Sequence, residues 1–508
     1  MSVVLFLSSC DDFLDKNPDN RAVLNATTVK DLLVSAYPDG NYSVLGEILS
    51  DNIIDNNNHY ASIGESPRLS SRSRMHDELF MWEPVVSSSS TDSPNGIWAP
   101  YYKAIAVANH ALEAIDLIEA EGTTEDLSPW RGEALLCRAY AHFILVNVFS
   151  QTYKNEEASK LDLGIPYATE PERDVFVKYE RGTVTDVYKK IEEDLVAGFP
   201  LIKDAIYQHP KYRFNKKAAA AFAARFYLFK RDYEKVVHYA NIVLGDDPTP
   251  FMRDWSPLYV DGSAFGYAYI DVNNPANLLL LATHSRMDEM WGGRYGHFGT
   301  ASSGALSGAG PTWAGKLPVF SKSTYVAPSS STVYTYLLYK QFPMFEFTDR
   351  VAQIGYWRSI RTEFTIEETL LCRAEAYVYL NRLDLALKDL EVWNAAHLCE
   401  ELTDAKIRAF YTAGRTLYVK RLRTEAICPD FVISSEQKPY IDCVLHFRRL
   451  ENLFDGTRWF DNKRYAMEIE HRVGEEDLVL RMEANDPRWA VQLPTTVISA
   501  GLEPNPER

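Results

Sequence analysis

This chain of 508 residues has no apolar run that approaches the roughly 20 residues a membrane-spanning helix requires. The sequence therefore predicts that the chain does not cross a membrane by itself. It also lacks an excess of positive charge: 53 Lys and Arg residues stand against 70 Asp and Glu residues, a formal net charge of −17. Such a surface repels a phosphate backbone, so nucleic acid is not an expected partner.

Motifs of catalysis and metal binding are lacking as well. None of the six cysteines forms a C-x-x-C pair, and neither H-E-x-x-H nor G-x-S-x-G occurs. We therefore expect no catalytic residue, no metal site and no cofactor. Two points stay open. The many Asp and Glu residues leave room for a glycosidase pair, and the disulfide state of Cys399, Cys428 and Cys443 is undecided, with a Cys428–Cys443 bond allowed in an oxidising compartment.

One stretch has the residue types of a calcium loop. Asp51, Asp55 and the asparagines at 56–58 place oxygen ligands close together, and calcium binds such oxygens. The stretch lacks the glycine and the terminal glutamate of a helix-loop-helix calcium site. A polar loop with Asx turns is the favoured interpretation.

Most of the chain has the periodicity of helices, and the composition, with 46% hydrophobic and 24% charged residues, allows a large core. Residues 134–149 are apolar almost all round, which indicates a buried helix. Two helix pairs resemble each other, at 215–244 and after the Thr365 and Glu368 capping box. Their turns lie near Arg231 and Arg382. The sequence predicts an all-α, mostly helical fold with tetratricopeptide-like helix hairpins as its scaffold.

A charged cluster near the C-terminus has helical spacing. At i, i+3 and i+4 its members favour ion pairs that fasten the C-terminal helix, and we interpret them as structural: Arg448, Arg449, Glu451, Asp455, Arg458, Asp461 and Arg464.

The first residues have the features of a secretory signal that ends at a cysteine. The apolar stretch from Val3 to Leu7 is followed by Ser8, Ser9 and Cys10, and small residues before a cleavage point are typical of signals. Leu-Ser-Ser-Cys resembles the bacterial lipoprotein box. Cys10 would then be the lipidated first residue, with residues 1–9 as the remnant of the signal, although the apolar stretch is short and no Lys or Arg precedes it.

Long irregular segments contain most of the aromatic residues outside helices. They lie at 50–95, 246–350 and 487–508, and loops of this length in a domain are usually functional. Flat rings among Gly, Ser and Pro favour stacking on the apolar faces of sugars, although such rings can instead pin loops to the scaffold. The predicted ligand-binding residues, with Trp291 and Tyr295 placed first, are Trp291, Tyr295, Trp313, Tyr267, Trp82, Trp98 and Arg294.

The order of several short stretches resembles the SusD/RagB family of outer-membrane nutrient-binding lipoproteins. The matching stretches are WAPYYKAIAVANHAL from Trp98, RGEALLCRAYAHFILVNVF from Arg131, GIP from Gly164, RGTVTDVYKKIEEDL from Arg181, KAAAAFAARFYL from Lys217, ETLLCRAEAYVYL from Glu368 and RRLENLFDGTRWFDNKR from Arg448. The resemblance implies a SusD-like fold and a protein without catalytic activity. It also implies a lipid anchor in the outer membrane facing the cell exterior, and delivery of an oligosaccharide to a SusC-like TonB-dependent transporter.

These observations together predict four parts: a signal remnant at 1–9, an N-terminal SusD-like part at 10–245, a loop-rich ligand-binding region at 246–350 and a C-terminal SusD/RagB part at 351–508. The expected function is surface binding of a glycan nutrient for uptake. Two alternatives stay open. One is a surface glycoside hydrolase, and the other is an oligopeptide-binding or protein-scaffold member of the same architecture.

Overall fold

The helices that the sequence indicates dominate the computed structural model. It describes residues 25–62, 64, 69–86, 91–173, 178–258, 263–290, 293–297, 308–323, 325–328, 334–412 and 419–506. The prediction of a mostly helical fold with long irregular segments is confirmed. Within the described residues, no helix is long and apolar enough to cross a membrane.

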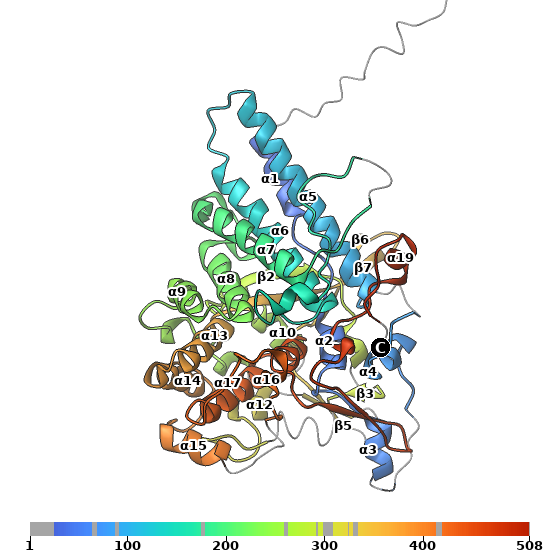
Figure 1. Cartoon of the computed structure of the whole chain (residues 1–508), viewed down its shortest axis with the longest axis vertical. Helices are drawn as coiled ribbons and strands as arrows, with labels where there is room; N and C mark the ends of the chain where they lie inside the picture. The colour runs from blue at the N-terminus through green and yellow to red at the C-terminus, as the bar shows by residue number, and fades with distance from the viewer. Residues whose placement is uncertain are drawn as a thin grey trace, which may run out of the picture.

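Seven helices form the scaffold, and most of them pack against their neighbour in the chain (Figure 1). The first three form one antiparallel layer, and two helix hairpins continue it, so that α9 lies against α13. Their bounds are α5 Pro94–Ala120, α6 Ser128–Phe149, α7 Val184–Gly198, α8 Lys216–Lys230, α9 Tyr233–Leu244, α13 Ile366–Tyr379 and α14 Leu383–Ala396.

The two helix hairpins turn in the same way, as the predicted repeat requires. In the first, the amide of Asp232 donates to the carbonyl of Tyr227 at 3.0 Å, and in the second the amide of Arg382 donates to Tyr377 at 2.8 Å. The residue before each amide has a left-handed backbone, with φ of 65° at Arg231 and 56° at Asn381. This pattern closes the last turn of a helix and reverses the chain. The two helix pairs that resemble each other in the sequence therefore share the same turn structure.

The other helices of the described residues surround this scaffold. They are α1 Ala26–Val34, α2 Ser43–Leu49, α3 Asn56–Ser62, α4 Arg74–Phe80, α10 Ser263–Tyr269, α12 Pro318–Ser323, α15 Asp404–Thr412, α16 Thr424–Ile427, α17 Lys438–Glu451, α18 Arg458–Arg464 and α19 Thr495–Ser499. The 3-10 turns are η2 Ala158–Leu161, η3 Phe199–Leu201, η4 Asp204–Ile206, η5 Pro210–Tyr212, η6 Thr249–Phe251, η7 Ser256–Leu258, η8 Met287–Met290 and η9 Pro487–Trp489.

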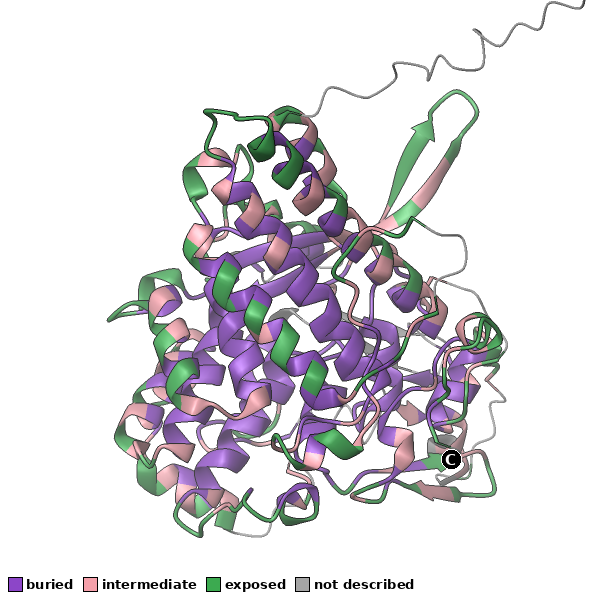
Figure 2. Ribbon diagram, turned by 45° about the horizontal axis from the view of Figure 1, so that its top comes forward, coloured by how far each residue is buried: buried purple, intermediate pink, exposed green. Residues whose placement is uncertain are grey.

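The structure also contains strands that the sequence did not predict, and several of them lie in the irregular segments. An antiparallel sheet has the order β2-β7-β6, formed by β2 Asn277–Thr283, β7 Ile354–Thr365 and β6 Pro343–Asp349. The outer ends of β6 and β7 form an exposed hairpin that stands out from the body of the molecule (Figure 2). Three two-stranded pairs complete the set: β1 Ile54–Asp55 with β3 Tyr295–Gly296, β4 Tyr325–Pro328 with β5 Tyr334–Leu337, and β8 Glu470–Val473 with β9 Leu478–Arg481.

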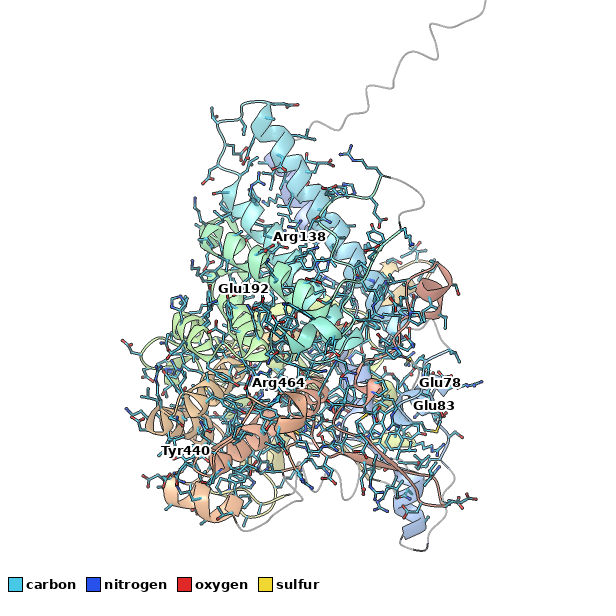
Figure 3. All side chains as sticks on the ribbon, viewed as in Figure 1. Glu78, Glu83, Arg138, Glu192, Tyr440 and Arg464 are labelled. Atoms are coloured by element: carbon cyan, nitrogen blue, oxygen red, sulfur yellow. The ribbon has the colours of Figure 1, made fainter. Side chains whose placement is uncertain are left out.

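The charged residues of α17 and α18 form buried ion pairs, so their structural interpretation is confirmed. Their partners mostly lie on other elements and not one turn away: Arg458 pairs with Asp51 at 2.8 Å, and Arg464 pairs with Glu375 at 2.9 Å. Arg464 lies in the interior, where several helices meet (Figure 3). Removing one partner of such a pair leaves a buried charge without compensation. These contacts therefore fasten the C-terminal part to the rest of the fold.

The structure places the residues of two candidates from the sequence, the calcium-type loop and the cysteine pair. Asp51 is held by guanidinium groups, and the amide of Asn57 donates to Asp55 at 3.0 Å in an Asx-type bond. In these ranges no group of His, Cys, Asp and Glu side chains is arranged to hold a metal ion. Cys428 and Cys443 are both free thiols, so the allowed disulfide between them does not form in this structure.

Candidate functional site

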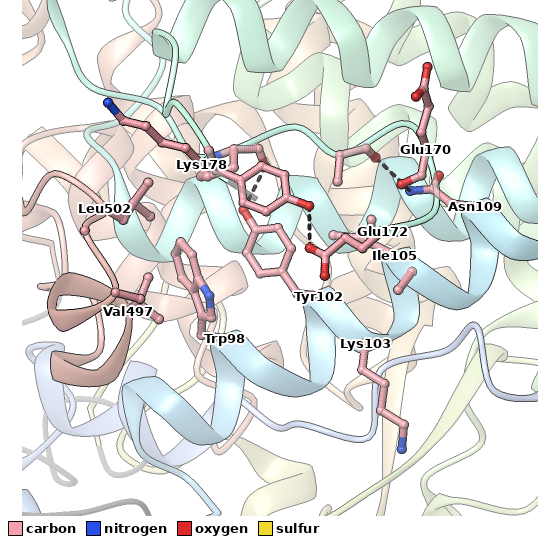
Figure 4. A pocket seen from close by; sticks show the side chains of 16 residues that line it. Trp98, Tyr102, Lys103, Ile105, Asn109, Glu170, Glu172, Lys178, Val497 and Leu502 are labelled. Carbon is pink, nitrogen blue, oxygen red and sulfur yellow. Dashed lines mark hydrogen bonds between the residues drawn. The ribbon is translucent and has the colours of Figure 1, made fainter. Parts of the chain in front are cut away.

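A groove runs along one face of α5 in the N-terminal half of the molecule. Its first cavity measures about 390 Å³ and adjoins a second of about 580 Å³. The two share several lining residues, so they form one continuous depression. One wall is α5, and the other is built from residues 166–173, residues 178–179, and the end of α19 with the turn after it, at 497–502 (Figure 4).

The helical period of α5 brings the residues of its wall to one face. Trp98, Tyr102, Ile105 and Asn109 follow one another at steps of three or four residues, which places them in a row. The helix begins just before this row, because the side chain of Ser93 accepts a hydrogen bond from the amide of Gly96 at 3.1 Å. An N-cap of this kind fixes the first turn and hence the direction of the row.

Two aromatic rings form the apolar base of the groove. The rings of Trp98 and Tyr102 lie 4.7 Å apart at 41°, and Trp98 meets Phe149 edge to face at 5.1 Å. Val497 of α19 and Leu502 in the turn after it face these rings (Figure 4). Only 8% of Trp98 is exposed, so the scaffold holds this ring rigidly at the base of the groove.

Hydrogen bonds hold the opposite wall to α5. The hydroxyl of Tyr102 donates to the carbonyl of Pro166 at 2.7 Å. The side-chain nitrogen of Asn109 donates to the carbonyls of Ala168 and Glu170 at 3.2 and 3.3 Å. Asn109 is itself fixed by Arg138, which donates to its side-chain oxygen at 2.9 Å. The groove is therefore formed before any ligand arrives.

A buried histidine supports the same wall. Burial lowers the pKa of His142 to about 3, so its ring is neutral at neutral pH. Its Nδ1 lies 2.8 Å from the carbonyl of Arg138, and its Nε2 accepts from the amide of Ala168 at 3.2 Å. These two bonds fit the neutral tautomer that has its proton on Nδ1. The wall therefore does not change with protonation near neutrality.

Exposed polar side chains form the rim of the groove. Lys103, Glu170, Glu172 and Lys178 are exposed there, and the hydroxyl of Tyr179 donates to Glu172. Burial and this carboxylate raise the pKa of Tyr179 to about 12, so the phenol keeps its proton. Apolar rings below and hydrogen-bonding groups above suit a ligand with both apolar faces and hydroxyls.

Of the predicted ligand-binding residues, Trp98 lines this groove and several others do not. Trp82 and Tyr295 are 1% and 3% exposed. They belong to one internal stack, in which Tyr295 lies on Phe80, Phe80 on His471 and His471 on Trp82. Both rings are packed inward, so neither offers a face to a ligand in this structure. The loops that carry them fold onto the core instead of extending into solvent.

Arg294 and Trp313 also have structural partners. Arg294 pairs with Asp55 at 2.7 Å and with Asp77 at 3.3 Å, which joins β3 to α4 and β1. The ring of Trp313 packs against α17, its indole nitrogen donates to the carbonyl of Gly308 at 3.0 Å, and 8% of the residue is exposed. Their prediction as ligand contacts overlooked these internal partners.

Three predictions have other outcomes. Tyr267 is 56% exposed on α10, away from the groove, with Phe342 as its ring neighbour at 5.5 Å. Its role as a ligand contact stays a prediction. Trp291, which was placed first, and Cys10, the predicted lipidation site, both lie outside the described residues.

Sequence reasoning missed most of the groove. Tyr102 and Asn109 follow Trp98 at helical steps, and that spacing could have identified them. The residues at 166–172 and 497–502 carry no comparable signal, because they reach α5 only through tertiary packing.

The comparisons with known proteins agree with this architecture. Residues 12–228 match the model of a family described as "Starch-binding associating with outer membrane". A SusD superfamily protein from Bacteroides thetaiotaomicron has 17% identity and a TM-score of 0.62, over 95% of this chain and 100% of that one. Another, from Bacteroides vulgatus, has 19% identity and a TM-score of 0.63, over 95% and 99%.

A third solved structure is described as a "Laminarin binding SusD-like protein". It has 16% identity and a TM-score of 0.54, and covers 95% of this chain and 99% of its own. At these identities the likeness shows the fold. No curated protein matches.

Proposed function

We propose that this chain, whose residues 12–228 match a starch-binding family model and whose fold resembles that of SusD superfamily proteins, binds an oligosaccharide in the groove beside α5. The observation that carries the proposal is the groove itself, with the rings of Trp98 and Tyr102 at its base and a polar rim above. A family description that names starch and a structural relative that binds laminarin support the ligand class.

The groove has a size and lining that suit short glycans. Binding sites for small ligands commonly measure about 300–1,000 Å³ and combine apolar walls with a few placed polar groups. A sugar ring has apolar C–H faces that can rest on Trp98 and Tyr102, while its hydroxyls can bond with Glu170 or Lys178 at the rim. The connection to the second cavity gives room for further sugar units along the helix.

We further propose that the protein binds its ligand without cleaving it and passes it on. In this proposal Cys10 carries the lipid anchor in the outer membrane, and a SusC-like TonB-dependent transporter receives the glycan. The lipoprotein-like sequence before Cys10 and the family description's association with the outer membrane support this part. A ligand held beside the transporter has a raised local concentration at its entrance.

A groove-filling substitution tests the binding site. Ala500 is exposed and lines the groove, so Ala500→Trp should fill it without disturbing the core. Ser499→Trp is the matched control, because Ser499 is equally exposed but does not line the groove. We expect Ala500→Trp to weaken the binding of laminarin or starch oligosaccharides more than about tenfold, with about 1.4 kcal/mol per tenfold, and Ser499→Trp to leave it unchanged.

Isothermal titration calorimetry measures the affinity, and thermal melting checks that both variants are folded. Equal affinity in Ala500→Trp and the wild type would overturn the groove as the binding site. An assay for new reducing ends tests the absence of cleavage in the same samples. Clear turnover would favour the glycoside hydrolase.

A further inference from the structure

Another cavity, separate from the two that form the groove, lies on the other side of α5. It measures about 350 Å³ and is enclosed by the end of α1, by α5, by the turn η5 and by strands β2 and β7. Lys103 lines both this cavity and the groove. Figure 4 shows its side chain leaving α5 away from Tyr102, so the helix forms a ridge between the two sites.

The charges around this cavity differ from those of the chain as a whole. Three cationic side chains line it, Lys103, Arg213 and Arg358, and Asp39 is the single acidic residue among its described lining residues. The whole chain carries a formal net charge of −17. Because both arginines have carboxylate partners and Asp39 also lines the cavity, Lys103 is the cation that no described carboxylate offsets at ion-pair distance, and it can attract an anion at short range.

The two arginines are held in place by partners outside the cavity. Arg213 pairs with Glu133 at 3.0 Å, and Arg358 pairs with Glu346 and donates to the hydroxyl of Tyr356 at 2.8 Å. A guanidinium has five N–H donors, so each keeps donors for another acceptor. In the part of the chain that the structure describes, no carboxylate lies within ion-pair distance of the exposed Lys103.

The remaining walls are apolar and aromatic. Leu280 and Leu281 of β2 and Pro100 of α5 contribute apolar surface, and the ring of Tyr212 is partly exposed at the edge. Inorganic ions do not need such walls, whereas a sugar ring can rest on them. The cavity therefore suits a group that joins an apolar face to a negative charge.

We propose that this cavity binds an acidic sugar unit, one bearing a carboxylate or a sulfate, of the same glycan that occupies the groove. The proposal rests on the proposed function, because it takes the ligand to be an oligosaccharide. A chain that crosses the ridge at Lys103 places neighbouring units in the two sites. The Lys103 ammonium and the free donors of the arginines receive the anionic group, and Tyr212 and β2 contact the ring.

The test compares acidic oligosaccharides with neutral forms of the same backbone. The probes are oligomers of galacturonate and mannuronate as free acids and as methyl esters, with a sulfated galactan oligomer and its desulfated form as a separate arm. Calorimetry at low and high salt measures binding to the full chain. We expect acidic forms to bind about twofold to fivefold more tightly at low salt, a range typical of one partly exposed charge contact, and the preference to shrink at high salt.

Substitutions assign the preference to the cavity. Lys103→Gln should remove most of the preference for acidic forms, and Lys103→Arg should keep it. Arg358→Gln changes a residue that lines the cavity and not the groove, so it should lower the preference as well, whereas a loss with Lys103→Gln alone would place the contact at the groove rim. Lys189→Gln on an exposed face of α7 is the matched control without effect. The carboxylate and sulfate arms decide which acidic group is recognised. No preference for any acidic form, or a preference that survives Lys103→Gln, would overturn the inference.

Failure of this inference can be told apart from failure of the proposed function. If Ala500→Trp abolishes the binding of acidic and neutral forms alike while neither is preferred, the groove stands and the acidic subsite is refuted. If the acidic preference depends on Lys103 while Ala500→Trp has no effect, the subsite stands and the groove assignment is wrong.

Discussion

Replacing Asp92 by asparagine should make the stability of this protein less dependent on pH. Asp92 is 3% exposed just before α5, where it accepts hydrogen bonds from the hydroxyl of Ser285 at 2.8 Å and from the amide of Arg286 at 2.7 Å. Burial outweighs these bonds and raises the pKa of Asp92 from 3.8 to about 7. The carboxyl thus joins the start of the groove helix to η8 while remaining protonated in mildly acidic solution.

The sign of the effect follows from proton binding. The folded state holds the proton more tightly than the unfolded state, so the stabilising contribution is complete below the unfolded pKa and is lost as pH rises through the folded value. A difference of about three pKa units, at 1.36 kcal/mol each, corresponds to about 4 kcal/mol in all. About 3 kcal/mol of this falls between about pH 5 and pH 8.

The asparagine that the variant carries at this position stays neutral and can keep both bonds, since its oxygen accepts from Arg286 and its nitrogen can donate to Ser285. Urea unfolding of wild type and Asp92→Asn across that pH range measures the difference. We expect the variant to gain on the wild type as pH rises, by an amount on the order of 3 kcal/mol. The exposed Asp246→Asn is the control and should show no trend. A constant difference, or one that shrinks as pH rises, would refute the reasoning.

Three further predictions concern the scaffold and are measured by chemical denaturation. Gly46→Ala should cost about 1–3 kcal/mol or more, because the new Cβ would lie 2.1 Å from the carbonyl oxygen of Gly456 and neither backbone can yield easily; a neutral effect would contradict this. Thr183→Ala should cost about 1 kcal/mol by removing the capping box of α7, and no loss would show that packing alone holds the helix. Arg225→Met should cost about 3–5 kcal/mol, because Glu363 and Glu368 would lose their buried partner; a stabilised variant would show that desolvation of the ions dominates.

Local sequence patterns were sufficient for the scaffold. Helical periodicity and turn residues depend on neighbours within a few positions, and so the paired hairpins could be predicted from their apolar patterns and from their turns near Arg231 and Arg382. The charged cluster from Arg448 to Arg464 was also identified as structural, although its partners on distant elements were not. Strand β2 was missed, because a continuous buried apolar run has no alternating pattern to distinguish it.

Only the tertiary structure decided where ligand-facing residues lie. Rings in Gly- and Ser-rich segments look exposed in the sequence, yet Trp82 and Tyr295 share an internal stack with a histidine from a hairpin near the C-terminus. The groove joins α5 to segments that lie about sixty to four hundred residues further along the chain. A helix period determines which side chains share a face, but what packs against that face depends on long-range contacts, which local spacing does not encode.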